Sequence, residues 1–384
     1  MRILIIHSRY LSGQASGENR VVEDETQLLA TAGHDIRTWT PGPSELEGLG
    51  AARLGAGAIR SREALRVVRR LVRDQRSEIV HCHNLFPSLS PAVISAAAAE
   101  GAAVVVTLHN YRLLCLPATF LRNGRRCEDC LGHLPWRGVV HRCYRRSALA
   151  SGALASSLAV HRLAGTFGRV GLYLAVSRFV RDKYLQAGFP SDRVVVKPSF
   201  VNAAPRRQGP GDYFLFLGRL SREKGLGTLL SLWSRSHDGA RRLVVAGDGP
   251  ERALLRNDSR TVDYRGSLSP AEIAPLLSGA RALLVPSLSY EGAPRVVLEA
   301  YASGIPVVAS RLGALPELVE DGRSGILVSP TDVTGWAAAV RRLETDGEAQ
   351  RMGERAQRLW RERYSPEQGL RNLEAAYHAA VARA

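Results

Sequence analysis

The sequence lacks any apolar run that approaches the roughly 18–20 residues needed to cross a bilayer. Residues 1–10 turn polar too soon to form a signal peptide. Cysteine is also scarce, with five residues in 384. These absences predict a cytoplasmic protein, in which cysteines serve as thiols or metal ligands more often than as disulfides.

Lysine is almost missing as well. Only Lys183, Lys197 and Lys224 are lysine among the 52 basic residues, and the formal net charge is +16. Such an excess is compatible with nucleic acid, an anionic membrane or an anionic substrate as partner, and equally with coding bias spread over solvated surfaces. Aromatic residues make up only 6% of the chain, and few of them lie among the arginines. A basic nucleic-acid-binding protein that bears zinc is therefore the weaker alternative, and nucleic acid is not an expected partner.

The apolar pattern alternates between two kinds of segment. Apolar strands with polar ends, at residues 1–8, 77–84 and 102–110, are separated by stretches with helical periodicity. A stretch rich in glycine and proline at 202–212 reads as a linker, after which the same alternation restarts. Alternation of this kind is typical of parallel sheets with helices on both faces.

The chain is also longer than one hydrophobic core usually serves. We therefore expect an α/β fold of two doubly wound, Rossmann-like domains that face each other across a cleft, with ligands beyond the carboxyl ends of the strands. The first domain spans residues 1–204 and the second 205–364. A terminal helix at 365–384 is expected to pack back on the first domain.

Basic and glycine-rich loops follow predicted strands in the second half. Arg219 ends one strand, and Lys224 lies five residues later, in a loop that leads to a helix. A guanidinium beside an ammonium suits a diphosphate, and a helix start adds free N–H groups; a solvated basic turn is the alternative. Gly247 and Gly249 follow another strand and suit either a close backbone approach to a ligand or an ordinary tight turn.

The segment 289–310, SYEGAPRVVLEAYASGIPVVAS, carries two glutamates around a predicted helix. Pro294 suits the first turn and Gly304 the C-terminal cap, so Glu291 projects from the loop at the helix entrance. Glu299 lies inside the helix, and a carboxylate buried among apolar neighbours needs a hydrogen-bonding partner, which a ribose could supply. The alternative makes Glu291 a helix-dipole carboxylate and Glu299 a surface residue.

Glu291 and Glu299 enclose seven residues. This E-x7-E spacing resembles the motif of family 4 retaining glycosyltransferases, which have two Rossmann domains in the architecture called GT-B. Four segments match that family in order and spacing: GRLSREKG at 218–225, GDGPE at 247–251, YEGAPRVVLEAYASGIPVVAS at 290–310 and GALPELVEDGRSGILV at 313–328. The resemblance is close over residues 213–330 and looser in the first half.

The resemblance implies roles for individual residues. Arg219 and Lys224 would bind the donor pyrophosphate, Glu291 the transferred sugar and Glu299 the ribose. His109, at the end of VTLHN, matches the family histidine near the reacting sugar and completes the implied catalytic set. The implied donor-binding set is Gly17, Gly247, Gly249, Leu268, Gly292, Ala293, Pro294, Arg295 and Glu299. Family members often carry two glycines in the first loop, where this chain has Ser16-Gly17.

The implied activity is transfer of a hexose-type sugar, with retention, from a UDP- or GDP-sugar to a glycan or lipid-linked acceptor in cell-envelope, capsular or exopolysaccharide synthesis. No catalytic metal is implied. Alternatives on the same architecture are a nucleotide-sugar epimerase and a natural-product glycosyltransferase. The basic helix predicted at 60–76 either meets an anionic membrane, which would place the protein on the inner face of the cell membrane, or packs its apolar stripe on the sheet.

An insert at about 111–146 carries four of the five cysteines. Cys115, Cys127, Cys130 and Cys143 have the spacing C-x11-C-x2-C-x12-C, which is compatible with a tetrahedral structural zinc site. Four reduced thiols in a loop are the alternative. His81 and His83 share one strand face, and a metal site there is the weaker reading.

Overall fold

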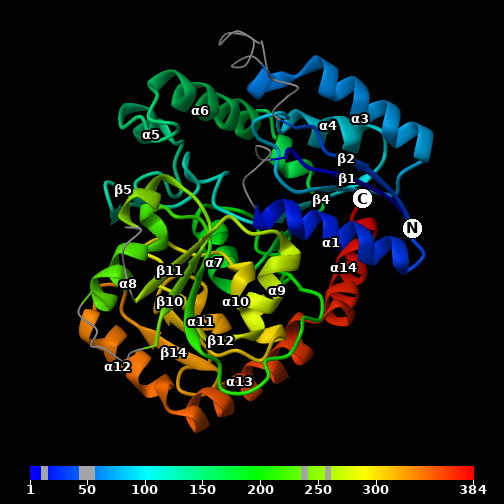
Figure 1. Ribbon diagram of the computed structural model, residues 1–384. Coiled ribbons are helices and arrows are strands. Elements are labelled where there is room, and N and C mark those ends of the chain that lie inside the picture. The colour runs from blue at the N-terminus through cyan, green and yellow to red at the C-terminus, as the bar shows by residue number, and fades with distance from the viewer. Residues whose placement is uncertain (10–15, 43–56, 235–240, 256–260) are drawn as a thin grey trace. The chain divides into compact units, whose positions relative to one another are not determined.

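The computed structural model describes residues 1–9, 16–42, 57–234, 241–255 and 261–384 (Figure 1). They divide into two compact units, each built on its own parallel sheet, which confirms the expected two-domain α/β fold. The first unit comprises Met1–Arg122, Cys127–Pro198 and Gly369–Ala384, and the second comprises Asn123–Arg126 and Ser199–Gln368. The main division thus falls between Pro198 and Ser199, whereas we expected it after residue 204.

The sheet of the first unit has the strand order β2-β1-β3-β4-β7-β8, and all neighbours are parallel. Its strands are β1 (Arg2–Ile6), β2 (Asp35–Trp39), β3 (Ile79–Cys82), β4 (Ala103–Leu108), β7 (Leu172–Ala175) and β8 (Val194–Val196). Its main helices are α1 (Gly17–Thr31), α3 (Arg62–Gln75), α4 (Ala92–Ala99), α6 (Ala148–Leu163) and α7 (Arg178–Gln186). Strands β3, β4 and β7 are buried along their whole length, as expected for parallel strands covered on both faces.

The terminal helix α14 (Pro366–Val381) completes the core of the first unit. Its residues Leu373, Tyr377 and Ala380 are fully buried and pack in one apolar cluster with α1 and strands β1, β3, β4 and β7. The last sixteen residues therefore belong to the first unit although the preceding 170 residues, 199–368, belong to the second.

Helix α3 is the basic amphipathic helix expected at 60–76. Its apolar residues Leu65, Val68 and Val72 are buried, and it packs against α4 and β1. The structure therefore favours the reading in which the apolar stripe of this helix packs inside the unit and its arginines face water. Among the described residues, no helix combines the length and apolar character that crossing a membrane requires.

The sheet of the second unit has the strand order β11-β10-β9-β12-β13-β14, again with parallel neighbours. Its strands are β9 (Tyr213–Leu217), β10 (Leu243–Ala246), β11 (Val262–Gly266), β12 (Ala280–Val285), β13 (Val307–Ser310) and β14 (Gly325–Val328). Its main helices are α8 (Leu226–Trp233), α9 (Pro270–Ser278), α10 (Arg295–Ala302), α11 (Leu315–Leu318), α12 (Val333–Glu344) and α13 (Asp346–Leu359). Successive residues of β9 enter two apolar clusters, because Phe214 and Phe216 pack on one face of the sheet and Leu215 on the other.

Each sheet reverses its direction of strand addition once. In the first unit the reversal lies between β1 and β3, and in the second it lies between β9 and β12. In open parallel sheets, ligands bind outside the carboxyl ends of the strands at such a switch point. We therefore expect functional side chains in the loops that follow β1, β3, β9 and β12.

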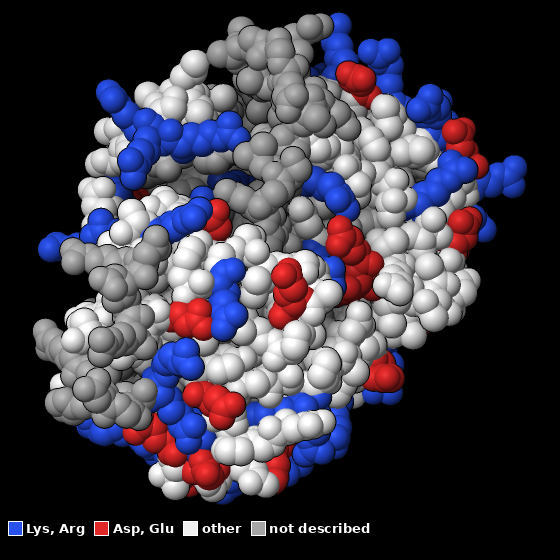
Figure 2. Space-filling view, viewed as in Figure 1, with Lys and Arg blue, Asp and Glu red and all other residues white. Residues whose placement is uncertain are grey.

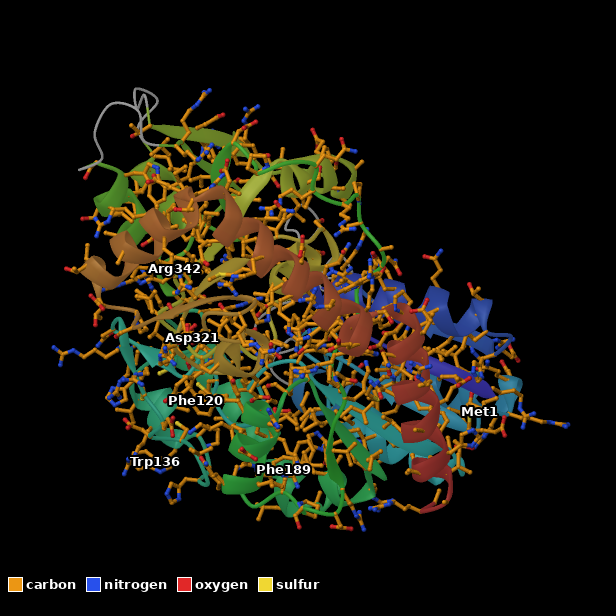
Figure 3. The ribbon with its side chains drawn as sticks, turned by 90° about the horizontal axis from the view of Figure 1, so that it is seen from below. Met1, Phe120, Trp136, Phe189, Asp321 and Arg342 are labelled. Atoms are coloured by element: carbon orange, nitrogen blue, oxygen red, sulfur yellow. The ribbon has the colours of Figure 1, made fainter. Side chains whose placement is uncertain are left out.

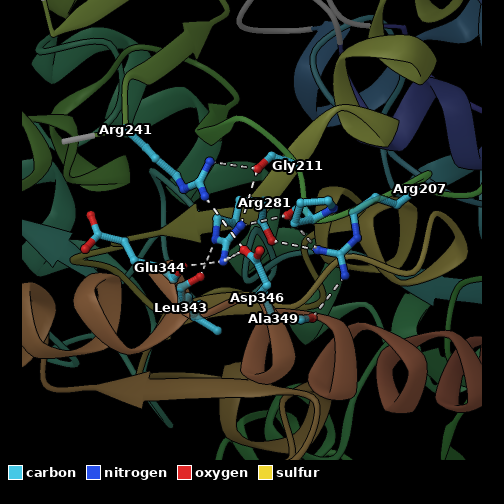
Figure 4. Close-up of polar contacts among 9 residues, drawn as sticks. Arg207, Gly211, Arg241, Arg281, Leu343, Glu344, Asp346 and Ala349 are labelled. Atoms are coloured by element: carbon cyan, nitrogen blue, oxygen red, sulfur yellow. Dashed lines mark hydrogen bonds and ion pairs between the residues drawn. The ribbon is translucent and has the colours of Figure 1, made fainter. Parts of the chain in front are cut away.

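A buried arginine ties β12 to the junction of α12 and α13 (Figure 4). Arg281 is 0% exposed and donates hydrogen bonds to the carbonyl oxygens of Leu343 and Glu344, at the end of α12, and of Pro210. Its guanidinium also lies 2.6 Å from Asp346 Oδ1. The last carbonyl groups of a helix have no partner inside the helix, so Arg281 satisfies groups that would otherwise be buried without one.

We expect Arg281→Leu to lower the free energy of unfolding by about 3 kcal/mol or more, because several carbonyl oxygens lose their buried partner. Urea denaturation followed by tryptophan fluorescence measures this change. Arg241→Leu is the matched control, because Arg241 contacts the same Asp346 at 3.7 Å but is partly exposed. Equal losses for both variants would contradict the assigned role of Arg281.

Candidate functional site

The implied donor residues of the second unit lie at the carboxyl ends of β9, β10 and β12. Lys224 ends a short turn after β9, and its Nζ lies 2.8 Å from Glu291 Oε1, in the loop after β12. Ser287 Oγ donates to the same carboxylate oxygen. The structure thus joins Lys224 and Glu291, which are 67 residues apart in sequence. Sequence reasoning missed Ser287, whose only signal is its place two residues after the end of β12.

Glycines allow the loops after these strands to approach closely. A Cβ at Gly247 would overlap the carbonyl oxygen of Gly218, and one at Gly249 would overlap that of Leu220. Both glycines also have positive φ, at 132° and 155°, which L side chains rarely adopt. Leu220 donates its N–H to the Asp248 carbonyl oxygen at 2.9 Å. The backbone on either side of Arg219, an exposed residue, is therefore held against the loop after β10.

The backbone of Glu291 is held in the same way. A Cβ at Gly313 would lie 2.7 Å from the Glu291 amide nitrogen, and the Ala314 N–H donates to the Glu291 carbonyl oxygen at 3.0 Å. Gly313 begins the matched segment 313–328, so this part of the motif supports the loop that carries Glu291. The Glu291 residue is only 9% exposed, and its carboxylate oxygen Oε1 contacts the Lys224 ammonium.

Helix α10 carries the second glutamate. We expected Pro294 in the first turn, but it takes the N-cap position and the helix begins at Arg295. Gly304 follows the C-cap with φ 72°, as predicted for a glycine that ends a helix. Glu299 Oε1 accepts a hydrogen bond from Arg295 Nε at 2.7 Å, one helical turn away. In this structure Glu299 therefore has a partner within the chain, Arg295.

The remaining donor residues of the second unit lie beside these groups in sequence. Gly292 and Ala293 connect Glu291 to the helix, and both are half-buried. Leu268 is half-buried in the loop between β11 and α9, at the same end of the sheet. Figure 2 shows basic side chains spread over one face of the molecule with acidic side chains between them, so the basic excess on that face is dispersed.

The implied residues of the first unit are Gly17 and His109. Gly17 is the first residue of α1, directly after the N-cap Ser16. His109 follows β4 and lines a pocket with Asn84, Asn110 and Arg112. Burial lowers the pKa of His109 to about 3, so the imidazole is neutral at neutral pH. A neutral imidazole offers one hydrogen-bond donor and one acceptor.

A buried polar cluster lies next to His109. Its Nε2 lies 2.8 Å from Nδ1 of His83, and His83 lies beside His81 with ring centroids 4.2 Å apart. Glu25 of α1 and Lys197 after β8 form an ion pair in the same cluster, at 0% and 2% exposure. Sequence reasoning singled out the two histidines for their shared face but missed Glu25, which reads as a surface residue of a polar helix. The scarcity of lysine was the available signal for Lys197.

The four cysteines of the insert line one pocket, which is distinct from the pocket at His109. Burial raises the pKa of the Cys115 thiol to about 11 and also raises the pKa values of the Cys130 and Cys143 thiols. In the part of the chain that the structure describes, the one group of three candidate ligand atoms within 4.8 Å of one another is Glu25, His81 and His83. No three of the cysteine sulfurs come that close.

Comparison with known families covers most of the chain. Residues 15–204 match the family described as Glycosyltransferase Family 4, and residues 211–346 match the family described as Glycosyl transferases group 1. The two matches meet near the boundary between the two units.

Curated relatives share only part of the chain. A glycogen synthase of Mycobacterium tuberculosis is 37% identical over 161 residues, which cover 40% of this chain and 38% of that protein. An MMP alpha-(1->4)-mannosyltransferase of Mycolicibacterium hassiacum is 39% identical over 140 residues, 35% of this chain and 34% of that protein. The matched region thus spans less than half the length of these relatives.

Solved structures share the fold of the whole chain. Sucrose-phosphate synthase from Thermosynechococcus elongatus has a TM-score of 0.71 at 17% identity and covers 100% of both chains. The Anabaena HepE protein in complex with UDP has a TM-score of 0.64 at 18% identity and covers 98% of this chain and 99% of its own. At these identities the likeness concerns the fold alone.

Proposed function

The chain belongs to glycosyltransferase family 4, and we propose that it transfers a hexose-type sugar, with retention, from a nucleoside diphosphate to an acceptor hydroxyl. The observation that carries the proposal is the Lys224–Glu291 ion pair, at 2.8 Å, at the switch point of the second sheet. A cation there suits a diphosphate, and a carboxylate there suits sugar hydroxyls.

The proposed chemistry needs charge stabilisation more than a nucleophile. As the bond from the sugar to the diphosphate breaks, negative charge builds on the phosphate oxygens, and Arg219, Lys224 and the amides of residues 292–295 stabilise it. The bond to the acceptor oxygen forms on the same face of the sugar, and the acceptor proton passes to a phosphate oxygen. His109 and Glu291 bind sugar hydroxyls. In this proposal protein cations take the role that magnesium has in other transferases.

We propose UDP as the nucleotide to test first, because a protein of the same fold was solved with UDP and UDP-glucose. The proposed acceptor is a glycan or lipid-linked hydroxyl of cell-envelope, capsular or exopolysaccharide synthesis, reached from the cytoplasmic side. Glu299, one helical turn from Arg295, would exchange that contact for the ribose hydroxyls.

Calorimetric titration with UDP, GDP, ADP and dTDP tests the donor site. We expect micromolar binding of one nucleotide, weakened about tenfold or more by Lys224→Ala, which removes a charge-assisted contact, and by Glu299→Gln, which removes a charged acceptor.

Two control variants should leave the affinity unchanged. Lys183→Ala breaks another lysine–glutamate pair of the same 2.8 Å length in the first unit, and Glu354→Gln alters an exposed glutamate on α13. If the unsubstituted protein binds none of the four nucleotides but binds nucleic acid tightly, the transferase proposal fails.

We further propose that Cys115, Cys127, Cys130 and Cys143 hold a structural zinc ion. The support is that all four line one pocket and that six of the seven described non-glycine residues with positive φ lie within residues 118–146. Such a backbone is costly and needs an external constraint to hold it. Because no three sulfurs lie within 4.8 Å of one another, zinc binding requires the loop to tighten and the thiols to lose their protons.

Metal analysis of the purified protein checks this proposal. We expect one zinc per chain, bound much more weakly in Cys130→Ser because the substitution removes one of the four thiolate ligands. The control is Cys82→Ser, which changes the buried cysteine of β3 outside the insert. Absence of zinc from protein purified without chelator, and no uptake on titration with zinc, would contradict the site.

We also propose that the protein contacts a membrane, through a surface on α5 (Trp136–Val140) and α6 and not through α3. Helix α5 and helix α6 expose Trp136, Val140, Leu149 and Leu163, the last at 84%. Figure 3 shows Trp136 at the outer edge of the insert. Residues 130–181 contain eight arginines and no acidic residue. Exposed apolar side chains among arginines suit the headgroup region of an anionic bilayer.

Sedimentation with lipid vesicles tests this surface. We expect binding to vesicles that contain phosphatidylglycerol, weaker binding at high salt, and loss of most binding in Trp136→Ser/Leu163→Ser. Leu254→Ser, an exposed leucine of the second unit, is the control. Self-association of the protein through this face without vesicle binding would show instead that a second copy of the chain covers it.

A further inference from the structure

The cluster around Glu25 holds two buried atoms without a hydrogen bond. Among the described residues, Oε2 of Glu25 and Nε2 of His83 have no hydrogen-bond partner, and both atoms are inaccessible to water. They lie 3.7 Å apart. Buried polar atoms are rarely left unpaired, and a proton on Nε2 of His83 directed at Glu25 is the arrangement in which a donor faces the carboxylate oxygen, although the separation is longer than a hydrogen bond.

The other polar groups next to Glu25 Oε2 and His83 Nε2 already have hydrogen-bond partners. Nδ1 of His81 lies 2.9 Å from the Tyr377 hydroxyl and its Nε2 lies 2.7 Å from Thr107 Oγ1, so both ring nitrogens of His81 have partners. The other Glu25 oxygen, Oε1, accepts from the Lys197 ammonium. His83 is therefore the group that Glu25 Oε2 can still bind.

The same contacts argue against a metal ion on Glu25, His81 and His83, although their ligand atoms lie within 4.8 Å of one another. The Lys197 ammonium already balances the Glu25 carboxylate and is only 2% exposed. A divalent ion would take the carboxylate from that ammonium and leave it buried beside a second positive charge, which is strongly unfavourable. The contacts of the cluster therefore favour protein groups over a metal ion as partners of Glu25.

The proton on His83 Nε2 determines the next contact. A neutral imidazole carries one proton, so Nδ1 of His83 is then an acceptor. Its partner at 2.8 Å is Nε2 of His109, which must donate. The other nitrogen of His109, Nδ1, is left without a proton, and no hydrogen bond joins it to any residue that the structure describes.

We propose that Glu25 and His83 are positioning residues that fix His109 with its proton on Nε2, so that its Nδ1 accepts a hydrogen bond from a substrate hydroxyl in the pocket that His109 lines. The inference rests on the proposed function for the identity of that substrate, a sugar, but not for the tautomer. The reverse arrangement puts the lone pair of His83 Nε2 against the Glu25 carboxylate, so that two buried acceptors face and repel each other.

Nitrogen-15 NMR of histidine-labelled protein tests the tautomer without any substrate. We expect the His109 signals of a protonated Nε2 and an unprotonated Nδ1, assigned by their loss in His109→Gln. In Glu25→Gln/Lys197→Met, which removes both charges of the ion pair together and so avoids an unpaired buried lysine, we expect the two His109 tautomers to become mixed. A protonated Nδ1 in the unsubstituted protein would overturn the proposal.

Kinetics supply the second readout. In the double variant we expect kcat to fall about 10- to 100-fold, by analogy with the loss of an outer hydrogen-bond partner of a metal-bound histidine, while UDP affinity stays unchanged. His161→Gln is the control, because His161 is also buried in the first unit but bonds Thr166 and the Ile59 carbonyl oxygen. If the folded double variant keeps the same His109 tautomer and the same kcat, the proposal that Glu25 and His83 position His109 is refuted. Failure of the unsubstituted protein to transfer any sugar would refute the proposed function and leave the tautomer result standing.

Discussion

An ion pair between lysine and glutamate joins distant segments of this chain at each of its three lysines. Lys197 pairs with Glu25 across 172 residues, Lys224 with Glu291 across 67, and Lys183 with Glu128 of the insert across 55. The other 49 basic residues are arginine. An ammonium is a compact point charge, whereas a guanidinium needs room and partners for five N–H groups. A lysine therefore suits a confined site with room for one carboxylate, as at Lys197, which is 2% exposed.

The Lys197–Glu25 pair has the largest structural consequence, because it is fully buried. A buried pair is stable only when its remaining hydrogen-bonding capacity is met. One Glu25 oxygen meets the ammonium, and the other faces His83, which in turn meets His109. The same set of contacts therefore compensates the buried charge of Glu25 and orients the pocket residue His109.

The sequence predicted what depends on local pattern. Alternating strands and helices gave both sheets, and Gly304 correctly marked the end of α10. Glu25 could not be found in this way, because it lies in a polar helix and its burial depends on a lysine 172 residues away. The contact between Glu299 and Arg295 was also not foreseen, because sequence reasoning looked to a ligand for the partner of that carboxylate, and Arg295 lies one helical turn earlier.

The two units hold the residues of their candidate sites in place by different kinds of contact. In the second unit the loops are shaped by backbone contacts that exclude any Cβ, as at Gly247 and Gly313. Such a contact requires glycine at a particular position of the sequence, because any other residue would add a Cβ there. In the first unit the pocket is shaped by hydrogen bonds among side chains from α1, β3, β4 and the segment after β8, and several sequences can satisfy a bond of that kind. We infer that this difference contributes to the resemblance being close over residues 213–330 and looser before them.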